Sequence, residues 1–159
     1  MTPEQLRIET LYDSVSTYYD NKADFFLKEG DTARAAVYAD SIIAKLQGRN
    51  ISGPAETRLR VYLANAYGVA GHPEDAKKEL ERARAAAYKW KILEADGTPT
   101  LDKRIVAAIL GRAGDYEGAV RELRDYSRRT SWTPAALALE PKIRVLRGNP
   151  LIEAFAREL

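Results

Sequence analysis

The sequence predicts an all-α fold in which three helical hairpins are followed by a C-terminal capping segment. Three observations support this prediction. Apolar residues recur at helical spacing along most of the chain, prolines stand where helix-like segments begin, and a glycine turn recurs at residues 30, 71 and 114. No stretch alternates apolar and polar residues convincingly, so we expect no sheet.

Composition excludes several classes of chemistry. The 159 residues include no cysteine and one histidine, His72, which removes disulfides, thiolate metal sites and histidine-based zinc motifs. With 45% hydrophobic and 30% charged residues, the chain is typical of a globular protein. Its length fits one domain or a short run of repeats. The sequence shows neither a long apolar window nor a signal peptide, so we expect a cytoplasmic protein without a membrane span.

The charge pattern argues against nucleic acid as a direct partner. The formal net charge is +2, but acidic and basic side chains interleave, as in the run from Arg121 to Asp125. Such interleaving is typical of a solvated helix face with i,i+4 pairs. A nucleic-acid-binding surface would instead carry a stripe of one sign.

Prolines mark the expected helix starts. Six of the seven stand just before a helix-like pattern, most of their predecessors can cap a helix, and proline is tolerated at the first helical position. The first pattern runs without a breaker from Pro3 to Glu29, which corresponds to about 40 Å of helix. In chain order, we expect helices over residues 3–29, 32–47, 54–70, 73–88, 99–113, 116–129, 134–139 and 150–158.

Three helix pairs repeat one pattern. Each pair turns on a glycine, which supplies a left-handed helix end, and an alanine five residues later lets the second helix approach the first closely. The glycines are Gly30, Gly71 and Gly114, and the alanines are Ala35, Ala76 and Ala119. We therefore divide a single domain, residues 1–159, into an extended first helix with unit one (1–47), unit two (54–88), unit three (99–129) and a C-terminal cap (130–159).

This spacing resembles the tetratricopeptide repeat (TPR). The period exceeds the 34 residues of that repeat, and the excess falls in residues 47–53 and 89–98, which we interpret as loop insertions. The resemblance implies a TPR-like α-α superhelix of right-handed sense. The residues of unit two that match the pattern are Leu63, Ala64, Tyr67, Gly71, Ala76, Leu80 and Ala83.

The C-terminal third resembles the last TPR region of bacterial multidomain signalling proteins. Those proteins carry a serine/threonine kinase, a cyclase-like part or a TolB-like or DNA-binding part upstream. Glu140-Pro141 stands where their tail has Asp-Pro, and Phe155 stands near its aromatic position. The resemblance covers roughly residues 33–159 and implies a regulatory or scaffolding piece that binds proteins. It brings no catalytic residue with it.

No constellation in the sequence points to an enzyme, a cofactor or a metal. Neither Gly-x-Ser-x-Gly nor a phosphate-binding glycine motif occurs. His72 stands between Gly71 and Pro73, where a turn or capping residue belongs, and no orienting partner for a general base is apparent. Asp20 and Asp24 share one helix face, but without ligands from a second helix we expect a solvated or groove-lining pair.

The resemblance to the tetratricopeptide repeat implies that the first helices line a concave surface, and the polar residues at the positions that face inward in that family are candidates for partner binding. This face is acidic at one end and basic at the other, which favours an extended or helical segment of mixed charge over a carboxylate clamp. The candidates are Asp20, Asp24, Arg58, Asn65, Arg104 and Arg112. The alternative is a small-ligand sensor with a pocket enclosed by the helices.

Two further segments suggest contacts. The first helix is about a dozen residues longer than a repeat helix needs, so residues 3–15 are expected to join an upstream domain or to pair with a second copy as a homodimer. Tyr88, Trp90 and Ile92 lie in the insertion after unit two. They form either an exposed aromatic contact or a group buried under unit three.

Overall fold

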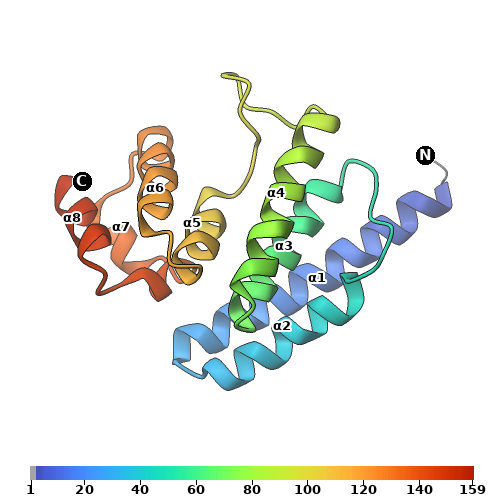
Figure 1. The fold of residues 1–159 in the computed structure, drawn as a ribbon, viewed down its shortest axis with the longest axis horizontal. Helices are drawn as coiled ribbons and strands as arrows, with labels where there is room; N and C mark the ends of the chain where they lie inside the picture. The colour runs from blue at the N-terminus through green and yellow to red at the C-terminus, as the bar shows by residue number, and fades with distance from the viewer. Residues whose placement is uncertain (1–2) are drawn as a thin grey trace.

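The computed structural model describes residues 3–159, with side chains described from Ser14 onward, and over this range the fold is all-α (Figure 1). The predicted all-helical class is confirmed over this range. None of the described helices is long and apolar enough to cross a membrane. The elements are α1 (Pro3–Glu29), α2 (Thr32–Leu46), α3 (Glu56–Val69), α4 (Pro73–Lys89), α5 (Lys103–Arg112), α6 (Tyr116–Thr130), α7 (Pro134–Leu139), the 3-10 helix η1 (Arg144–Leu146) and α8 (Pro150–Glu158).

Six of the helices form three hairpins. α1 packs against α2, α3 against α4, and α5 against α6 (Figure 1). The hairpins follow one another in space as in sequence, because α2 contacts α3 and α4 contacts α5. The first helices of the hairpins also touch, α1 with α3 and α3 with α5. These three helices therefore share one face, which we call the inner face.

The same turn closes each hairpin. The φ angles of the three turn glycines are 80°, 85° and 82°, a left-handed backbone that glycine adopts without a side-chain clash. The residue after each glycine donates its N–H to the carbonyl five positions earlier, at 2.8, 2.8 and 2.9 Å. The sequence repeat is therefore also a repeat of structure. The hydrogen-bonded pairs are Asp31 with Phe26, His72 with Tyr67, and Asp115 with Leu110.

Small residues set the distance between paired helices. Each alanine that follows a turn glycine by five positions has 0% of its surface exposed, and its small side chain lets the two helices of the pair pack closely. Asp115 also caps α6, since its Oδ1 accepts the N–H of Gly118 at 2.8 Å. The three alanines are Ala35, Ala76 and Ala119.

The predicted start of α3 at Pro54 is wrong by two residues, whereas α4, α7 and α8 begin at their prolines as predicted. Gly53 has a φ angle of 95°, and its carbonyl accepts the N–H of Glu56 at 3.0 Å. The positive φ angle and this hydrogen bond place residues 53–55 in a turn, and the helix begins after it. Proline here belongs to the turn and not to the first helical position.

The predicted start of α5 at Pro99 is also wrong, because α5 begins at Lys103. Thr100 donates its N–H to the carbonyl of Ile92 at 2.9 Å, and Leu93 and Pro99 form an isolated antiparallel bridge. The insertion after α4 is thus a short hairpin-like loop that holds the proline in extended backbone, as Figure 1 shows above α4 and α5. Asp102 caps α5 instead.

This loop is fastened to α6. The guanidinium of Arg129 lies 3.3 Å from Glu94 Oε2 and 2.9 Å from Asp96 Oδ2. The loop therefore reaches across from the end of α4 to the far end of the next hairpin. It braces units two and three from outside the core.

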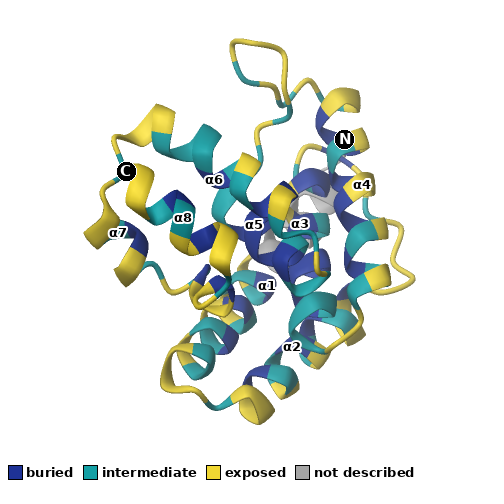
Figure 2. Cartoon of the chain, turned by 60° about the vertical axis from the view of Figure 1, so that its left-hand side comes forward, coloured by how far each residue is buried: buried dark blue, intermediate teal, exposed yellow. Residues whose placement is uncertain are grey.

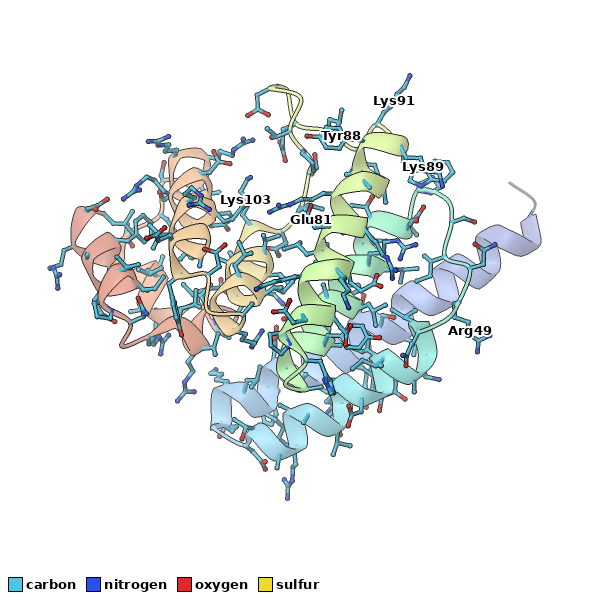
Figure 3. The ribbon with its side chains drawn as sticks, viewed as in Figure 1. Arg49, Glu81, Tyr88, Lys89, Lys91 and Lys103 are labelled. Carbon is cyan, nitrogen blue, oxygen red and sulfur yellow. The ribbon has the colours of Figure 1, made fainter. Side chains whose placement is uncertain are left out.

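A further ion pair joins the same two units, since Arg84 of α4 lies 3.3 Å from Glu122 of α6. Arg84 also pairs with Glu81 of its own helix at 3.0 Å. Within unit three, Lys103 at the start of α5 reaches Asp125 of α6 at 2.7 Å. Figure 3 shows Glu81 and Lys103 between α4 and the α5–α6 hairpin.

Buried apolar residues run through the array from α2 to α8, and Figure 2 shows them where helices face one another. At the C-terminal end, α7, η1 and α8 cover the apolar side of α5 and α6. Leu139 remains 79% exposed, so the cap buries only part of its own apolar surface. The buried residues of this cap are Leu137, Ile143, Leu146, Ile152 and Phe155.

The predicted helix over residues 3–29 is confirmed as α1. The predicted pairing of residues 3–15 with a second copy stays a prediction, because the side chains of residues 3–13 lie outside the described ones.

Gly111 of α5 lies against the cap, and a Cβ added to it would collide with Leu146. We predict that Gly111→Ala lowers the free energy of unfolding by about 1–3 kcal/mol, since overpacking forces neighbours to shift. Urea denaturation measures the change. Leu139→Ala in the same cap is the control, because the Leu139 side chain is 79% exposed. Equal losses in the two variants would contradict the prediction.

Candidate functional site

Three of the candidate residues form a hydrogen-bonded chain on the inner face. Asn65 of α3 lies at its centre: its amide nitrogen donates to Asp20 Oδ1 at 2.8 Å, and its amide oxygen accepts from Arg112 at 2.9 Å. Asp20 is 3% exposed and Asn65 is 4% exposed. The chain therefore links α1, α3 and α5 through polar side chains that water scarcely reaches.

Lys142 completes this network, although the sequence did not single it out. It lies between α7 and η1, and its ammonium is 2.6 Å from Asp24 Oδ2 and 3.4 Å from Asp20 Oδ2. The structure thus brings a fourth candidate, Asp24, into the same group. The sequence could indicate only that buried carboxylates need a cation nearby. It could not indicate which of the 25 lysines and arginines supplies that cation.

Arg104 binds Glu140, which lies two residues before Lys142 in the segment between α7 and η1. Its guanidinium donates to Asp102 Oδ2 at 2.9 Å and to Glu140 Oε2 at 3.0 Å, and it lies 5.4 Å from the centre of the Tyr126 ring. Glu140 and Lys142 therefore bind opposite ends of the inner face. The predicted acidic and basic ends are both occupied by one segment of the chain itself, Glu140–Lys142.

Small residues make room for the network. Arg112 stands at the end of α5, and its side chain crosses α3 beside Gly68, where an added Cβ would lie 3.3 Å from Arg112 Cδ. A Cβ at position 68 would press on the aliphatic part of the Arg112 side chain. The helical spacing of Asn65 and Gly68 places both on one side of α3.

Two residues considered from the sequence lie apart from this group. Arg58 is exposed near the start of α3, about two helical turns before Asn65. His72 is exposed in the turn before α4, where it caps the helix by position, and its ring meets Tyr67 edge to face at 6.3 Å. This placement matches the expected turn histidine.

Burial and the opposite charges nearby act in opposite directions on the pKa values of Asp20 and Lys142. Burial raises the pKa of Asp20, and Asp24 adds to the rise, while Lys142 and the hydrogen bond from Asn65 oppose it. Burial alone would lower the pKa of Lys142, but Asp20 and Asp24 outweigh it and raise that pKa. Burial lowers the pKa of Arg112 despite the two aspartates. When all are ionised, two carboxylates face two cations.

Hydrogen bonds from Arg104 decide the protonation of Asp102. Burial alone would raise the pKa of Asp102, but these bonds and the positive charge lower it overall. The same contacts raise the pKa of Arg104. This pair therefore stays ionised, and it suits holding a segment in place better than transferring a proton.

A second polar cluster lies between α3 and α4. Arg60 is 2.9 Å from Glu56 and 3.1 Å from Glu79, and Trp90 donates its ring N–H to Glu56 at 2.9 Å. Burial would raise the pKa of Glu56, but the bonds from Trp90 and Arg60 lower it. A cavity of about 520 Å³ opens nearby, between the α2–α3 loop and α4, lined by Arg60, Glu79 and Arg82 among others.

The aromatic residues that the sequence placed in the insertion after unit two are divided, and Tyr88 belongs to the last turn of α4. Trp90 is anchored by Glu56, whereas Tyr88 is 56% exposed. Figure 3 shows Tyr88, Lys89 and Lys91 at the end of α4, away from the C-terminal cap. The sequence therefore missed that Trp90 belongs to the α3–α4 cluster.

Among the residues with described side chains, no group of three or more acidic or histidine side chains is placed to hold a metal ion. Comparisons of the chain with protein-family models, with curated proteins and with solved structures each found no match.

Lys142→Ala removes the ammonium that contacts both Asp20 and Asp24. We expect it to lower the free energy of unfolding by about 3 kcal/mol, as breaking one partner of a buried pair does. Chemical denaturation at neutral pH measures the loss. Lys77→Ala is the control, because its pair with Glu74 is exposed and worth at most about 1 kcal/mol. A loss from Lys142→Ala no greater than that from the control would refute the ion-pair account.

Asp20→Asn should change how stability depends on pH. Because folding raises the pKa of Asp20 above its ordinary value of 3.8, the folded chain binds this proton more tightly than the unfolded chain. The wild type therefore loses stability, relative to the variant, as pH rises from about 4 through the raised pKa, and the difference is level above it. Urea denaturation from pH 4 to 8 measures both chains. Parallel curves would show that Asp20 is not responsible.

Proposed function

We propose that this chain is a protein-binding module of tetratricopeptide type, a TPR-like superhelix that holds a segment of another protein against its helices. The observation that carries the proposal is the contact of α1 with α3 and of α3 with α5. Because each hairpin also closes with the same glycine turn, successive first helices present side chains on one side. Stacked helix pairs of this kind offer extended concave surfaces to protein partners.

The inner face accepts a segment of mixed charge from its own chain. Arg104 binds Glu140 at 3.0 Å and Asp24 binds Lys142 at 2.6 Å, with Pro141 between them. Glu140 has extended backbone. This intramolecular contact supports the expectation that the array suits peptide segments of mixed charge, with Asp20, Asn65, Arg104 and Arg112 as the polar framework.

The cellular role is proposed on the sequence resemblance alone. The tail from Gly114 to Phe155 resembles the TPR region of bacterial signalling proteins, so we propose a cytoplasmic regulatory or scaffolding role without catalysis. Interleaved charge along the helices supports a protein partner over nucleic acid.

The competing proposal is a small-ligand sensor. The cavity of about 520 Å³ beside α4 favours it, because polar side chains converge there from two helices and a loop. Its charged groups are paired with one another: Glu79 contacts both Arg60 and Arg82. A ligand would have to displace these pairs, which favours the protein-binding proposal.

Peptide selection tests the proposed function. A random-peptide phage library is selected against the immobilised chain, and recovered peptides are resynthesised and titrated by fluorescence anisotropy. We expect saturable binding with dissociation constants of about 1–100 μM, equivalent to roughly −8 to −5 kcal/mol, and no binding of scrambled sequences. If no peptide binds while a metabolite library raises the melting temperature, the sensor proposal replaces this one.

A further inference from the structure

One side of α1 carries a row of residues that points away from α2 and α3. This outer stripe consists of Tyr18, Asn21, Lys22, Phe25 and Lys28, which recur at helical spacing. Tyr18 and Phe25 are each 54% exposed. In contrast, the neighbouring Phe26 turns toward α2, where its ring stacks on Tyr38 at 5.4 Å. Large aromatic side chains left half exposed on a regular stripe are typical of a surface that binds another protein.

The outer stripe is hollowed along its length. A cavity of about 300 Å³ is lined by Tyr18, Asn21, Lys22 and Phe25. A second cavity of about 160 Å³ shares Asn21 and Phe25 and reaches Lys28 and the segment Glu140–Lys142. Because the two share residues, they form one shallow groove that follows α1 for about 15 Å, or three helical turns.

The unpaired charge in this groove is positive. The acidic residues on its border are engaged, since Asp24 pairs with Lys142 at 2.6 Å and Glu140 pairs with Arg104 at 3.0 Å. Lys22 lies 5.7 Å from the Tyr18 ring centre. Within residues 14–159, neither Lys22 nor Lys28 shows a carboxylate partner among the ion pairs of the structure. The groove therefore combines exposed aromatic rings with two available ammonium groups.

The two ends of the array differ. At the end of unit three, α7, η1 and α8 bury Leu146, Ile152 and Phe155 against α5 and α6. At the end of unit one, no described residue covers Tyr18 or Phe25 in this way. A stacked array needs an element to cover each terminal apolar face, so the outer stripe is the position where one more helix would pack.

We propose that the outer stripe of α1 docks an amphipathic helix of a partner protein, with apolar residues on one side and acidic residues flanking them. This inference rests on the proposed function, because it locates the partner of the same module. Helix-in-groove recognition matches the helical spacing of the stripe. A second copy of the chain fits less well, because two facing stripes would bring Lys22 and Lys28 of both copies together with no acidic residue in either stripe.

Two synthetic helical peptides test the proposal. Both carry leucine at positions i, i+3, i+4 and i+7, and their flanking positions are all glutamate in one and all lysine in the other. We expect the full chain to bind the acidic peptide, measured by fluorescence anisotropy, and to bind the basic peptide at least about tenfold more weakly. Raising the salt concentration should weaken the acidic complex, because Lys28 is exposed and Lys22 is partly exposed.

Variants locate the binding site. Lys22→Glu/Lys28→Glu should weaken the acidic peptide about tenfold or more and strengthen the basic one, while Phe25→Ala should weaken both. Lys45→Glu and Val37→Ala are matched controls, because both residues are exposed on α2. Circular dichroism melting confirms that each variant is folded. The proposal is overturned if the controls weaken binding as much as the stripe variants.

The remaining outcomes separate this inference from the proposed function. If peptides recovered by display bind but ignore the stripe variants, the module binds proteins elsewhere and the docking inference fails alone. If no peptide of any kind binds, both fail. A concentration-dependent dimer that Phe25→Ala dissolves, measured by sedimentation, would assign the stripe to a second copy instead.

Discussion

The hydrogen-bonded contact of Asp20, Asn65 and Arg112 is the constraint on which the arrangement of the three hairpins depends. A carboxylate accepts and a guanidinium donates, so the amide of Asn65 has one orientation that serves both. Apolar side chains would tolerate a small slide of α1 or α5 along α3. The polar contact does not, because a slide would leave a buried charge without a partner, at a cost of about 3–5 kcal/mol.

The C-terminal segment covers the array by two different physical means. Leu146 and Phe155 bury apolar surface against α5 and α6, an effect that is large but tolerant of position. Glu140 and Lys142 add charge pairs with Arg104 and Asp24 that depend steeply on geometry. The first effect keeps the cap attached, and the second sets where it lies. Unit one and the cap, far apart in sequence, are thereby held in one position.

Local signals in the sequence predicted local structure well. The turns at Gly30, Gly71 and Gly114 followed from spacing because each depends on a few neighbouring residues. The inward positions of Asp20 and Asn65 followed from the resemblance to the tetratricopeptide repeat, counted back from those turns. The starts at Pro54 and Pro99 failed because contacts outside the helix decide them, such as the bond from Thr100 to Ile92. Lys142 could not be assigned, since periodicity carries no information about which distant cation meets a buried carboxylate. The polar groups of this network are paired with one another within the chain.

The loop between α4 and α5 has a mechanical consequence. In a stack of helical hairpins each hairpin contacts only its neighbours, so the stack can bend at the joint where two hairpins meet. The ion pairs of Arg129 with Glu94 and Asp96 add a second line of contact across one such joint, far from the core. Bending that joint must stretch these pairs as well as shear the packed helices. A change in the length of this loop would therefore move Glu94 and Asp96 relative to Arg129 and remove this outer contact between units two and three.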